Sequence, residues 1–395
     1  MYLNFPEELK EVFEIILNNK GQCRLVGGCV RDYLNNKRPK DFDIATDLLP
    51  QRVLEVFSNY NYKVIPIGLK HGTVLVRVKN HSFEITTLRK DLKCFGRYAE
   101  VEYTNDWAID ASRRDFTMNA ISITPQGKVY DYFSGKEDLQ KGIVRFVGNP
   151  PKRIEEDYLR IMRFFRFLGC FSLKNIDNAS YTAAIDNISN LQYISRERIK
   201  CELLKLLCSA YAKDVIIRLN KEQVLGYIGL PQITLDNKKI EAVTFKKDDP
   251  MVNLSILIIL SNNQKVEYLN ELKYNIALSN KEQKELASLV AFNPKDKFTN
   301  FDHYKYWYEY GKELYLRFLF VVNSVNPFTN YAQYFNEASS DVKHIFPIKG
   351  KDLEKQGCEG KIIGQLLSQG KEYWHRNSNN LSRTELLNFM QNLSF

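Results

Sequence analysis

The sequence lacks several features that would assign its class at once. It contains no run of 18 apolar residues, the nearest approach being Met251–Leu260, so we expect no membrane-spanning helix. Residues 1–13 include three glutamates and no apolar core, which is untypical of a signal or transit peptide. The seven cysteines form no C-x-x-C pair, which favours reduced thiols. These absences predict a cytoplasmic protein that has no membrane partner.

Histidine is also scarce, with five in the chain and none followed by aspartate. This argues against a histidine-based zinc site and against the His-Asp doublet of metal phosphohydrolases. The segment from Gly364 to Lys371 superficially resembles a phosphate-binding loop. Its spacing is one residue too long and Glu372 replaces the required Ser or Thr, so we reject that interpretation.

What the chain does contain is typical of a large globular protein. Its 395 residues correspond to two or three domains, and 44% of them are hydrophobic and 13% aromatic. Lys and Arg outnumber Asp and Glu by 56 to 47, for a net charge of +9. A basic balance weakly favours a polyanionic partner, because clustered cations release counterions from nucleic acid. From the net charge alone, a soluble basic protein without such a partner is an equally good interpretation.

The pattern of hydrophobic residues divides the chain near residue 145. Before it, short β-branched runs alternate with turns, which predicts a mixed α/β domain. After Pro150-Pro151 the spacing is helical to the end. The expected strands are 24–26, 41–45, 73–79, 83–88, 120–124 and 129–132. The expected helices are 6–18, 30–35, 50–59, 153–169, 195–210, 254–260, 281–292, 304–324, 362–374 and 383–392. The expected domains are 1–145, 146–210, 211–300 and 301–395.

Two aspartates, Asp41 and Asp43, stand two residues apart in a predicted strand. Side chains at this spacing project from the same face. Two like charges so close are unfavourable unless a cation lies between them, and Mg²⁺ takes one or two carboxylates together with substrate phosphates. Glu84, in the strand predicted at 83–88, is a candidate third carboxylate. The pattern indicates metal-assisted attack on phosphorus, with a solvated strand end as the alternative.

A glycine pair, Gly27-Gly28, lies between a predicted strand and a predicted helix. Glycine permits close backbone approach, and free N–H groups at a helix N-terminus bind phosphate. Arg31 could reach the same anion. A tight turn that needs positive φ is the ordinary alternative. The pair becomes much more specific because Arg31-Asp32 and then the two aspartates follow it.

These segments resemble a known family, the class II tRNA nucleotidyltransferases and bacterial poly(A) polymerases. The resemblance is dense over residues 24–207 and weak again from Gly350 to Gly364. The motifs that carry it are Gly27-Gly28 with Arg31-Asp32 and Asp41-Phe42-Asp43-Ile44-Ala45-Thr46; Arg113-Arg114-Asp115 through Asn119; Asp131, Gly135, Asp138 and Arg145; Glu155-Glu156-Asp157 through Arg160; and Ser195-Arg196-Glu197-Arg198.

The resemblance implies a polymerase-β-like nucleotidyltransferase head with a mixed sheet, within an α+β fold whose neck, body and tail are all helical. It implies Mg²⁺-dependent addition of nucleotides from CTP and ATP to the 3′ end of tRNA. Asp41 and Asp43 would hold the metal, with Glu84 beside them as a third catalytic carboxylate. The implied nucleotide-binding residues are Gly27, Gly28, Arg31, Asp32, Arg113, Arg114, Asp115, Asn119, Asp157, Arg160 and Arg163. The chain is of a size to act as a monomer.

Base choice can be interpreted from Asp157 and Arg160. On one continuous helix over 153–169 they would be i, i+3 neighbours and present an acceptor beside a donor. Cytosine and adenine both offer an amine next to a ring acceptor, whereas guanine and uracil reverse the two positions. Mismatched polar groups left unpaired cost about 1–3 kcal/mol each. The alternative, an incidental surface ion pair, loses weight beside the other motifs.

The family contains both CCA-adding enzymes and poly(A) polymerases, and two features favour CCA addition. The segment 68–74 resembles the start of the corresponding strand in the tRNA-specific members of the family. Residues 89–100 resemble the flexible loop of CCA-adding enzymes, with Arg89, Asp91, Gly96 and Arg97 as its residues. Phe95 stands where the family usually has aspartate. A poly(A) polymerase, a partial (A-only or CC-only) adding enzyme and a non-catalytic RNA-binding relative are the alternatives. The aromatic residues of 304–315 recur at helical spacing, so core packing is favoured over RNA stacking.

Overall fold

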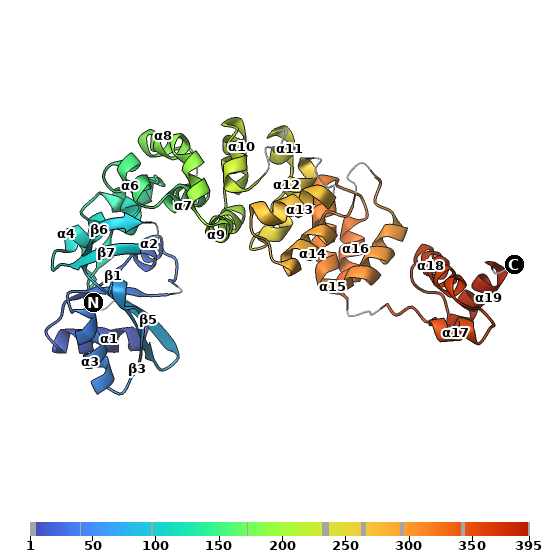
Figure 1. Cartoon of the computed structure of the whole chain (residues 1–395), viewed down its shortest axis with the longest axis horizontal. Coiled ribbons are helices and arrows are strands. Elements are labelled where there is room, and N and C mark those ends of the chain that lie inside the picture. The colour runs from blue at the N-terminus through green and yellow to red at the C-terminus, as the bar shows by residue number, and fades with distance from the viewer. Residues whose placement is uncertain are drawn as a thin grey trace. The chain divides into compact units, whose positions relative to one another are not determined.

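The computed structural model describes residues 5–39, 41–95, 98–171, 173–230, 237–261, 266–292, 296–340 and 344–393. The chain divides into two compact units, Met1–Gln232 and Ile233–Phe395 (Figure 1). Strands are confined, among the described residues, to the first unit, and the second unit is helical. The α+β class and the change from mixed to helical structure are therefore confirmed.

The first unit contains a seven-stranded sheet in the order β3-β4-β5-β2-β1-β8-β9. Only the β2–β5 pair is parallel; the other neighbours are antiparallel. The strands are β1 (Cys23–Val26), β2 (Asp43–Thr46), β3 (Lys63–Gly68), β4 (Thr73–Val78), β5 (His81–Thr87), β8 (Ser122–Ile123) and β9 (Val129–Tyr130), with a separate two-stranded sheet of β6 (Arg89–Phe95) and β7 (Tyr98–Tyr103).

The helices of the first unit cover and extend this sheet (Figure 1). They are α1 (Glu7–Asn18), α2 (Gly28–Leu34), α3 (Pro50–Asn59), α4 (Trp107–Ser112), α5 (Gly135–Lys141), α6 (Pro150–Glu156), α7 (Leu159–Leu168), α8 (Asn178–Asp186), α9 (Arg196–Leu207) and α10 (Ala212–Lys221). Four 3₁₀ helices join them: η1 (Leu69–His71), η2 (Thr117–Asn119), η3 (Ile188–Tyr193) and η4 (Leu225–Ile228).

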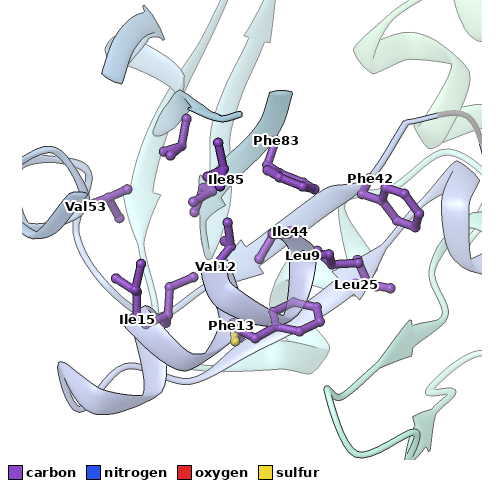
Figure 2. Close-up of a cluster of buried hydrophobic side chains, with 14 of the residues drawn as sticks. Leu9, Val12, Phe13, Ile15, Leu25, Phe42, Ile44, Val53, Phe83 and Ile85 are labelled. Carbon is purple, nitrogen blue, oxygen red and sulfur yellow. The ribbon is translucent and has the colours of Figure 1, made fainter. Parts of the chain in front are cut away.

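The core of the sheet lies on the side that α1 and α3 cover. Val12 and Ile16 of α1 and Phe57 of α3 pack with Ile44 and Ile85 of the central strands, all of them buried. Figure 2 shows side chains of both helices facing those of the strands. Alternate residues of a strand point to opposite faces, so Asp43 and Glu84, which precede those isoleucines, belong to the other face. The packing of one face thus sets the direction of the carboxylates on the other.

The second unit consists of α11 (Asn237–Ala242), α12 (Pro250–Leu260), α13 (Val266–Asn275), α14 (Asn280–Leu289), α15 (Asn300–Val325), α16 (Tyr331–Ser339), α17 (Gly350–Glu354), α18 (Lys361–Arg376) and α19 (Arg383–Leu393). Its most apolar helix, α12, is buried from Met251 to Leu260, which confirms the predicted interior helix. None of the described helices is both long and apolar enough to cross a membrane.

Two expected helices are not continuous. The helix predicted over 153–169 is broken into α6 and α7, because Asp157 between them has extended backbone angles, φ −155° and ψ 106°. The helix predicted over 304–324 contains Gly311 at φ 70° and ψ 171°, which interrupts the helical geometry inside α15. Hydrophobic periodicity continues across both sites, so it does not reveal either break.

Candidate active site

Two of the three predicted carboxylates lie side by side at the end of the central strands. Asp43 opens β2 and stands in register with Glu84 on the parallel neighbour β5. Partial withdrawal from bulk water raises the pKa of Asp43, with Arg114 opposing and Asp41 adding to the rise. The pKa of Glu84 is also raised, first by burial and then by the charges of Asp43 and Asp41. All three side chains remain open to solvent, so a ligand can reach them.

The glycine turn is in contact with this cluster. Gly27 precedes α2 with φ 71° and ψ −135°, a conformation that residues with a Cβ rarely adopt. A Cβ built at Gly27 would lie 3.3 Å from Arg114 Nη1 and 3.5 Å from Asp43 Oδ2. The absence of a side chain therefore lets the backbone approach a carboxylate and a guanidinium at once. Gly28, the first residue of α2, lies beside the Arg31 guanidinium.

Arg113 and Arg114 are held by a residue that sequence reasoning missed. Asp110 of α4 is only 3% exposed, and its carboxylate accepts from Arg113 Nε at 2.9 Å and from Arg114 Nη2 at 3.1 Å. Desolvation raises the pKa of Asp110, but the two guanidiniums outweigh it and hold that pKa below its usual range. The i−3 and i−4 spacing from the arginines, on a helix, is the signal that would have identified it.

Four predicted residues form one chain of hydrogen bonds across the unit. Arg31 Nη1 donates to Asn119 Oδ1 at 2.9 Å, and Asn119 Nδ2 donates to Asp115 Oδ1 at 2.9 Å. Arg163 Nε of α7 donates to Asp115 Oδ2 at 2.8 Å. Asp115 and Arg163 therefore neutralise each other. Asp32 accepts from Arg31 Nε and Nη2 at 3.0 and 2.8 Å, so it holds Arg31 in place.

Further contacts support the turn that carries Asn119. Asp138 of α5 accepts from Thr117 Oγ1 at 2.7 Å and from Arg145 Nε at 3.1 Å. Gly135 lies so close to η2 that an added Cβ would be 2.0 Å from the Thr117 carbonyl oxygen. The motif of Asp131, Gly135, Asp138 and Arg145 thus fixes the position of η2 and, through it, Asn119.

The prediction that Asp157 and Arg160 lie on one continuous helix is wrong for this structure. The break between α6 and α7 separates them: Asp157 Oδ1 accepts the N–H of Leu159 at 3.1 Å, and Oδ2 accepts from Arg198 Nη2 of α9 at 2.8 Å. Arg160 Nη1 instead donates to Glu156 Oε2 at 2.5 Å. Aspartate competes well for free backbone N–H groups at a helix start, which explains the break.

Arg160 nevertheless stays close to Asp157 and to the arginine pair. Its backbone N–H donates to the Asp157 carbonyl at 2.9 Å, so the two residues share one turn. Its guanidinium donates to the carbonyl oxygens of Arg153 and Arg113, at 2.8 and 3.3 Å. Glu156 and Arg198 are the partners that sequence reasoning did not assign.

The segment predicted as a flexible loop contains the β6–β7 hairpin. Arg89 is anchored: its guanidinium donates to the His71 carbonyl and to Asp91 Oδ1, and its backbone N–H donates to Asp110 Oδ1 at 3.3 Å. Burial lowers the pKa of Arg89, and Arg113 adds to that effect. Gly96 and Arg97 lie outside the described residues. Cross-strand pairing of residues 89–95 with 98–103 explains why a strand replaces the expected loop.

The donor set at the strand end suits a hard divalent cation. Within the described parts of the chain, no three His, Cys, Asp or Glu side chains are grouped closely enough to make a metal site by themselves. Asp41 and Asp43 supply hard oxygen atoms, and burial raises the pKa of Asp43 although the charge of Arg114 opposes that rise. Such a pair fits Mg²⁺, which commonly takes its other ligands from phosphates and water.

Known proteins resemble this chain over most of its length. Residues 23–145 match the family described as poly A polymerase head domain, and residues 175–235 match a probable RNA and SrmB-binding site of polymerase A. The chain is 34% identical to the human mitochondrial CCA tRNA nucleotidyltransferase 1 over 403 residues, 98% of this chain and 90% of that protein. It is 31% identical to a Staphylococcus saprophyticus CCA-adding enzyme over 88% of each chain. The crystal structure of the Bacillus stearothermophilus CCA-adding enzyme with CTP matches with a TM-score of 0.75 and 25% identity, covering 97% of this chain and 100% of that one.

Proposed function

The chain belongs to the family of CCA tRNA nucleotidyltransferases and CCA-adding enzymes, and we propose from this membership that it completes the 3′ end of tRNA. It is an enzyme that adds C, C and A from CTP and ATP without a nucleic-acid template. The predicted regions 1–145, 146–210, 211–300 and 301–395 would serve as its head, neck, body and tail. The human relative is named as mitochondrial, so the cytoplasmic location remains a prediction.

The observation that carries the chemical part of the proposal is the cluster of Asp41, Asp43 and Glu84 beside Gly27 and Arg114. The backbone of the glycine turn and the Arg114 guanidinium offer donors for a triphosphate next to the carboxylates. Arg113 and Arg114 are held by Asp110, so they need no rearrangement to present their remaining donors. In the reaction the tRNA 3′-hydroxyl attacks the α-phosphorus, and the bond to pyrophosphate breaks.

We assign Asp41 and Asp43 as the residues that would hold Mg²⁺ together with the nucleotide phosphates. When bound, Mg²⁺ neutralises charge that develops on the phosphate and favours ionisation of the attacking hydroxyl. Glu84 supports this site by its negative charge, since it stands next to Asp43 on the adjacent strand.

Nucleotide choice is proposed to rest on Asp157 and Arg160. The Asp157 carboxylate can accept from the amine of cytosine or adenine, and the Arg160 guanidinium can donate to the neighbouring ring nitrogen. Arg198 and Glu156 brace these two groups at 2.8 and 2.5 Å, which limits their freedom before the base enters. Guanine and uracil would place like groups together and leave them unpaired.

Poly(A) addition is the second candidate, because the match over residues 23–145 is to a poly A polymerase head domain. The relatives that span 88% or more of this chain are named for CCA addition, which favours the first candidate.

Primer extension separates the candidates. tRNA transcripts ending before CCA, at C and at CC are incubated with labelled CTP, ATP or both, and Mg²⁺. Three additions that stop at CCA are expected. Long A tails on many RNAs would establish a poly(A) polymerase, and a stop at CC would identify a partial enzyme. Absence of incorporation by a folded chain that still binds tRNA would contradict nucleotidyl transfer altogether.

A further inference from the structure

The second unit contains a pocket that the proposed chemistry does not use. Its volume is about 630 Å³, within the range of small-ligand sites. It lies where α15, α16 and the connection from α18 to α19 meet. Its lining includes Tyr304, Trp307, His344, Trp374, Asn380 and Ser382.

The inner wall of the pocket is aromatic and tightly packed. Trp307 is 6% exposed and Trp374 is 1% exposed, so both rings are fixed by the surrounding core. Tyr304 lies nearly parallel to Trp307, with ring centroids 6.4 Å apart and planes at 23°. Core packing, expected for the aromatic residues of 304–315, is confirmed for Trp307, and the same packed ring also forms the floor of a cavity. Rigid aromatic walls suit a flat, aromatic ligand.

His344 is the unusual polar group of this wall. Its ring meets Trp307 edge to face, at 4.4 Å between centroids and 84°. Its Nε2 atom is buried and has no hydrogen-bond partner. By contrast, both ring nitrogens of His303 have partners, Tyr315 at 2.6 Å and Glu337 at 3.1 Å. A buried polar atom without a partner is unfavourable, so its presence at a cavity points to a ligand that supplies the missing bond.

The ring of His344 is suited to such a bond in its neutral form. Burial lowers the pKa of His344, and Glu337 only partly opposes that effect. A neutral imidazole carries one donor and one acceptor nitrogen, so it can pair with either kind of group on a heterocycle.

The rim of the pocket is a polar turn held in a costly conformation. Ser378 and Asn379 both have positive φ, 58° and 54°, although neither is glycine. Asn379 fixes the turn, because its Nδ2 donates to the Tyr304 carbonyl at 3.1 Å and its Oδ1 lies 2.7 Å from His375 Nδ1. The turn presents the side chains of Ser378 and Asn380 at the pocket mouth.

We propose that this pocket receives one unstacked nucleobase of the tRNA substrate, which stacks on the half-buried ring of Tyr304 and hydrogen-bonds to His344 Nε2. The proposal rests on the proposed function for the identity of the RNA. A base offers a flat ring to the wall and polar edge groups to the imidazole and the rim. Single-stranded positions of RNA are commonly bound in this way, by stacking on aromatic side chains and by edge hydrogen bonds.

The test compares tRNA binding by the full-length chain and three variants, measured by filter binding without CTP or ATP. His344→Ala is expected to weaken binding about 3- to 10-fold, the range for losing one hydrogen bond. Asn380→Ala, at the exposed rim, should weaken it less. Tyr274→Ala is the matched control, because Tyr274 is an aromatic residue of the same unit that is 76% exposed. Unchanged melting temperatures establish that all variants fold.

Two further measurements complete the test. In nucleotide addition, His344→Ala should raise the KM for tRNA and leave kcat unchanged, and adenosine or cytidine at millimolar concentration should compete with tRNA for the wild type only. Equal tRNA affinity of the wild type, His344→Ala and Asn380→Ala would overturn the pocket assignment. Binding of free nucleosides that depends on His344 without any effect on tRNA affinity would overturn it too. A wild type that binds tRNA but adds no nucleotide would refute only the proposed function.

Discussion

Asp43 and Glu84 stand opposite one another on parallel strands, so each carboxylate raises the cost of ionising the other. The folded chain therefore binds these protons more tightly than the unfolded chain does. The free energy of unfolding therefore decreases as the pH rises from the pKa of glutamate in the unfolded chain to the raised pKa of Glu84 in the folded chain. Above that second pKa the full destabilisation is present.

Glu84→Gln is consequently expected to raise the melting temperature at pH 7. The gain corresponds to no more than a few tenths of a kcal/mol, since the side chain is exposed and screened. The gain should vanish at about pH 3, well below the unfolded pKa of glutamate, where Glu84 is protonated in both states. Calorimetry at the two pH values measures it, with Glu55→Gln on α3 as the exposed control. An equal gain at both pH values would show that charge is not the cause.

Asp41→Asn and Asp43→Asn should each lower nucleotide incorporation by at least about 100-fold while tRNA binding is retained, because the charge at the reacting phosphate is lost. Mg²⁺ should raise the melting temperature of the wild type and have less effect on either variant, since one of its hard ligands is gone. Glu55→Gln should behave as wild type in both measurements. Surviving catalysis in Asp41→Asn would refute the metal assignment.

Gly27→Ala is expected to destabilise the first unit by about 1–3 kcal/mol, because alanine is strained at the backbone angles of Gly27. The new methyl group would also crowd Arg114 Nη1 and touch Asp43 at ordinary contact distance, so incorporation should fall. Gly364→Ala, within α18 and with open space around its Cβ position, is the matched control. It should be neutral or slightly stabilising. Thermal melting and steady-state kinetics distinguish the two variants.

Arg198→Gln should impair base choice although residue 198 need not touch the base. Asp157 loses its ion pair at 2.8 Å and its carboxylate gains freedom, so misincorporation of UTP and GTP should rise several-fold. Arg198→Lys restores a positive charge and should recover part of the selectivity. Glu197→Gln, an exposed change on the same helix, should have no effect. Loss of tRNA binding without a change in selectivity would contradict this role.

Arg160→Ala should relax the choice of base more than it lowers affinity for triphosphates in general. The reason is that Arg160 is proposed to donate to the ring nitrogen that differs between permitted and excluded bases. Single-turnover addition with each of the four nucleotides measures the effect. A uniform loss of affinity for all four would instead make Arg160 a phosphate ligand.

Local patterns predicted β1, β2 and the β4–β5 hairpin, and the alternation of Val74, Val76 and Val78 marks β4 as a strand with one buried face. The strand β3 was missed because Pro66 interrupts its pattern. Proline is tolerated there because β3 is an edge strand, a fact that depends on the whole sheet. The placement of Glu84 near the aspartates could be anticipated, but its parallel register with Asp43 could not.

The partners of the predicted site residues were harder to foresee. Arg198 lies forty-one residues from Asp157 in sequence, and only tertiary packing of α7 against α9 brings them together. Asp115 was expected to face the nucleotide, yet it forms an ion pair with Arg163 from another helix. Residue type and spacing indicate which groups belong to a site, whereas the division of those groups into ligand-facing and bracing members depends on contacts between distant segments.

The residues of the site described above are synthesised in sequence order, because a ribosome makes the chain from its N-terminus. Gly27, Asp43 and Glu84 emerge first, Arg114 follows, and Asp157 and Arg160, the residues proposed for base choice, come later. The brace Arg198 is the last of these to be made. A chain arrested between residues 163 and 195 would thus carry every group proposed for the chemistry, and both groups proposed for discrimination, without the contact that steadies one of them.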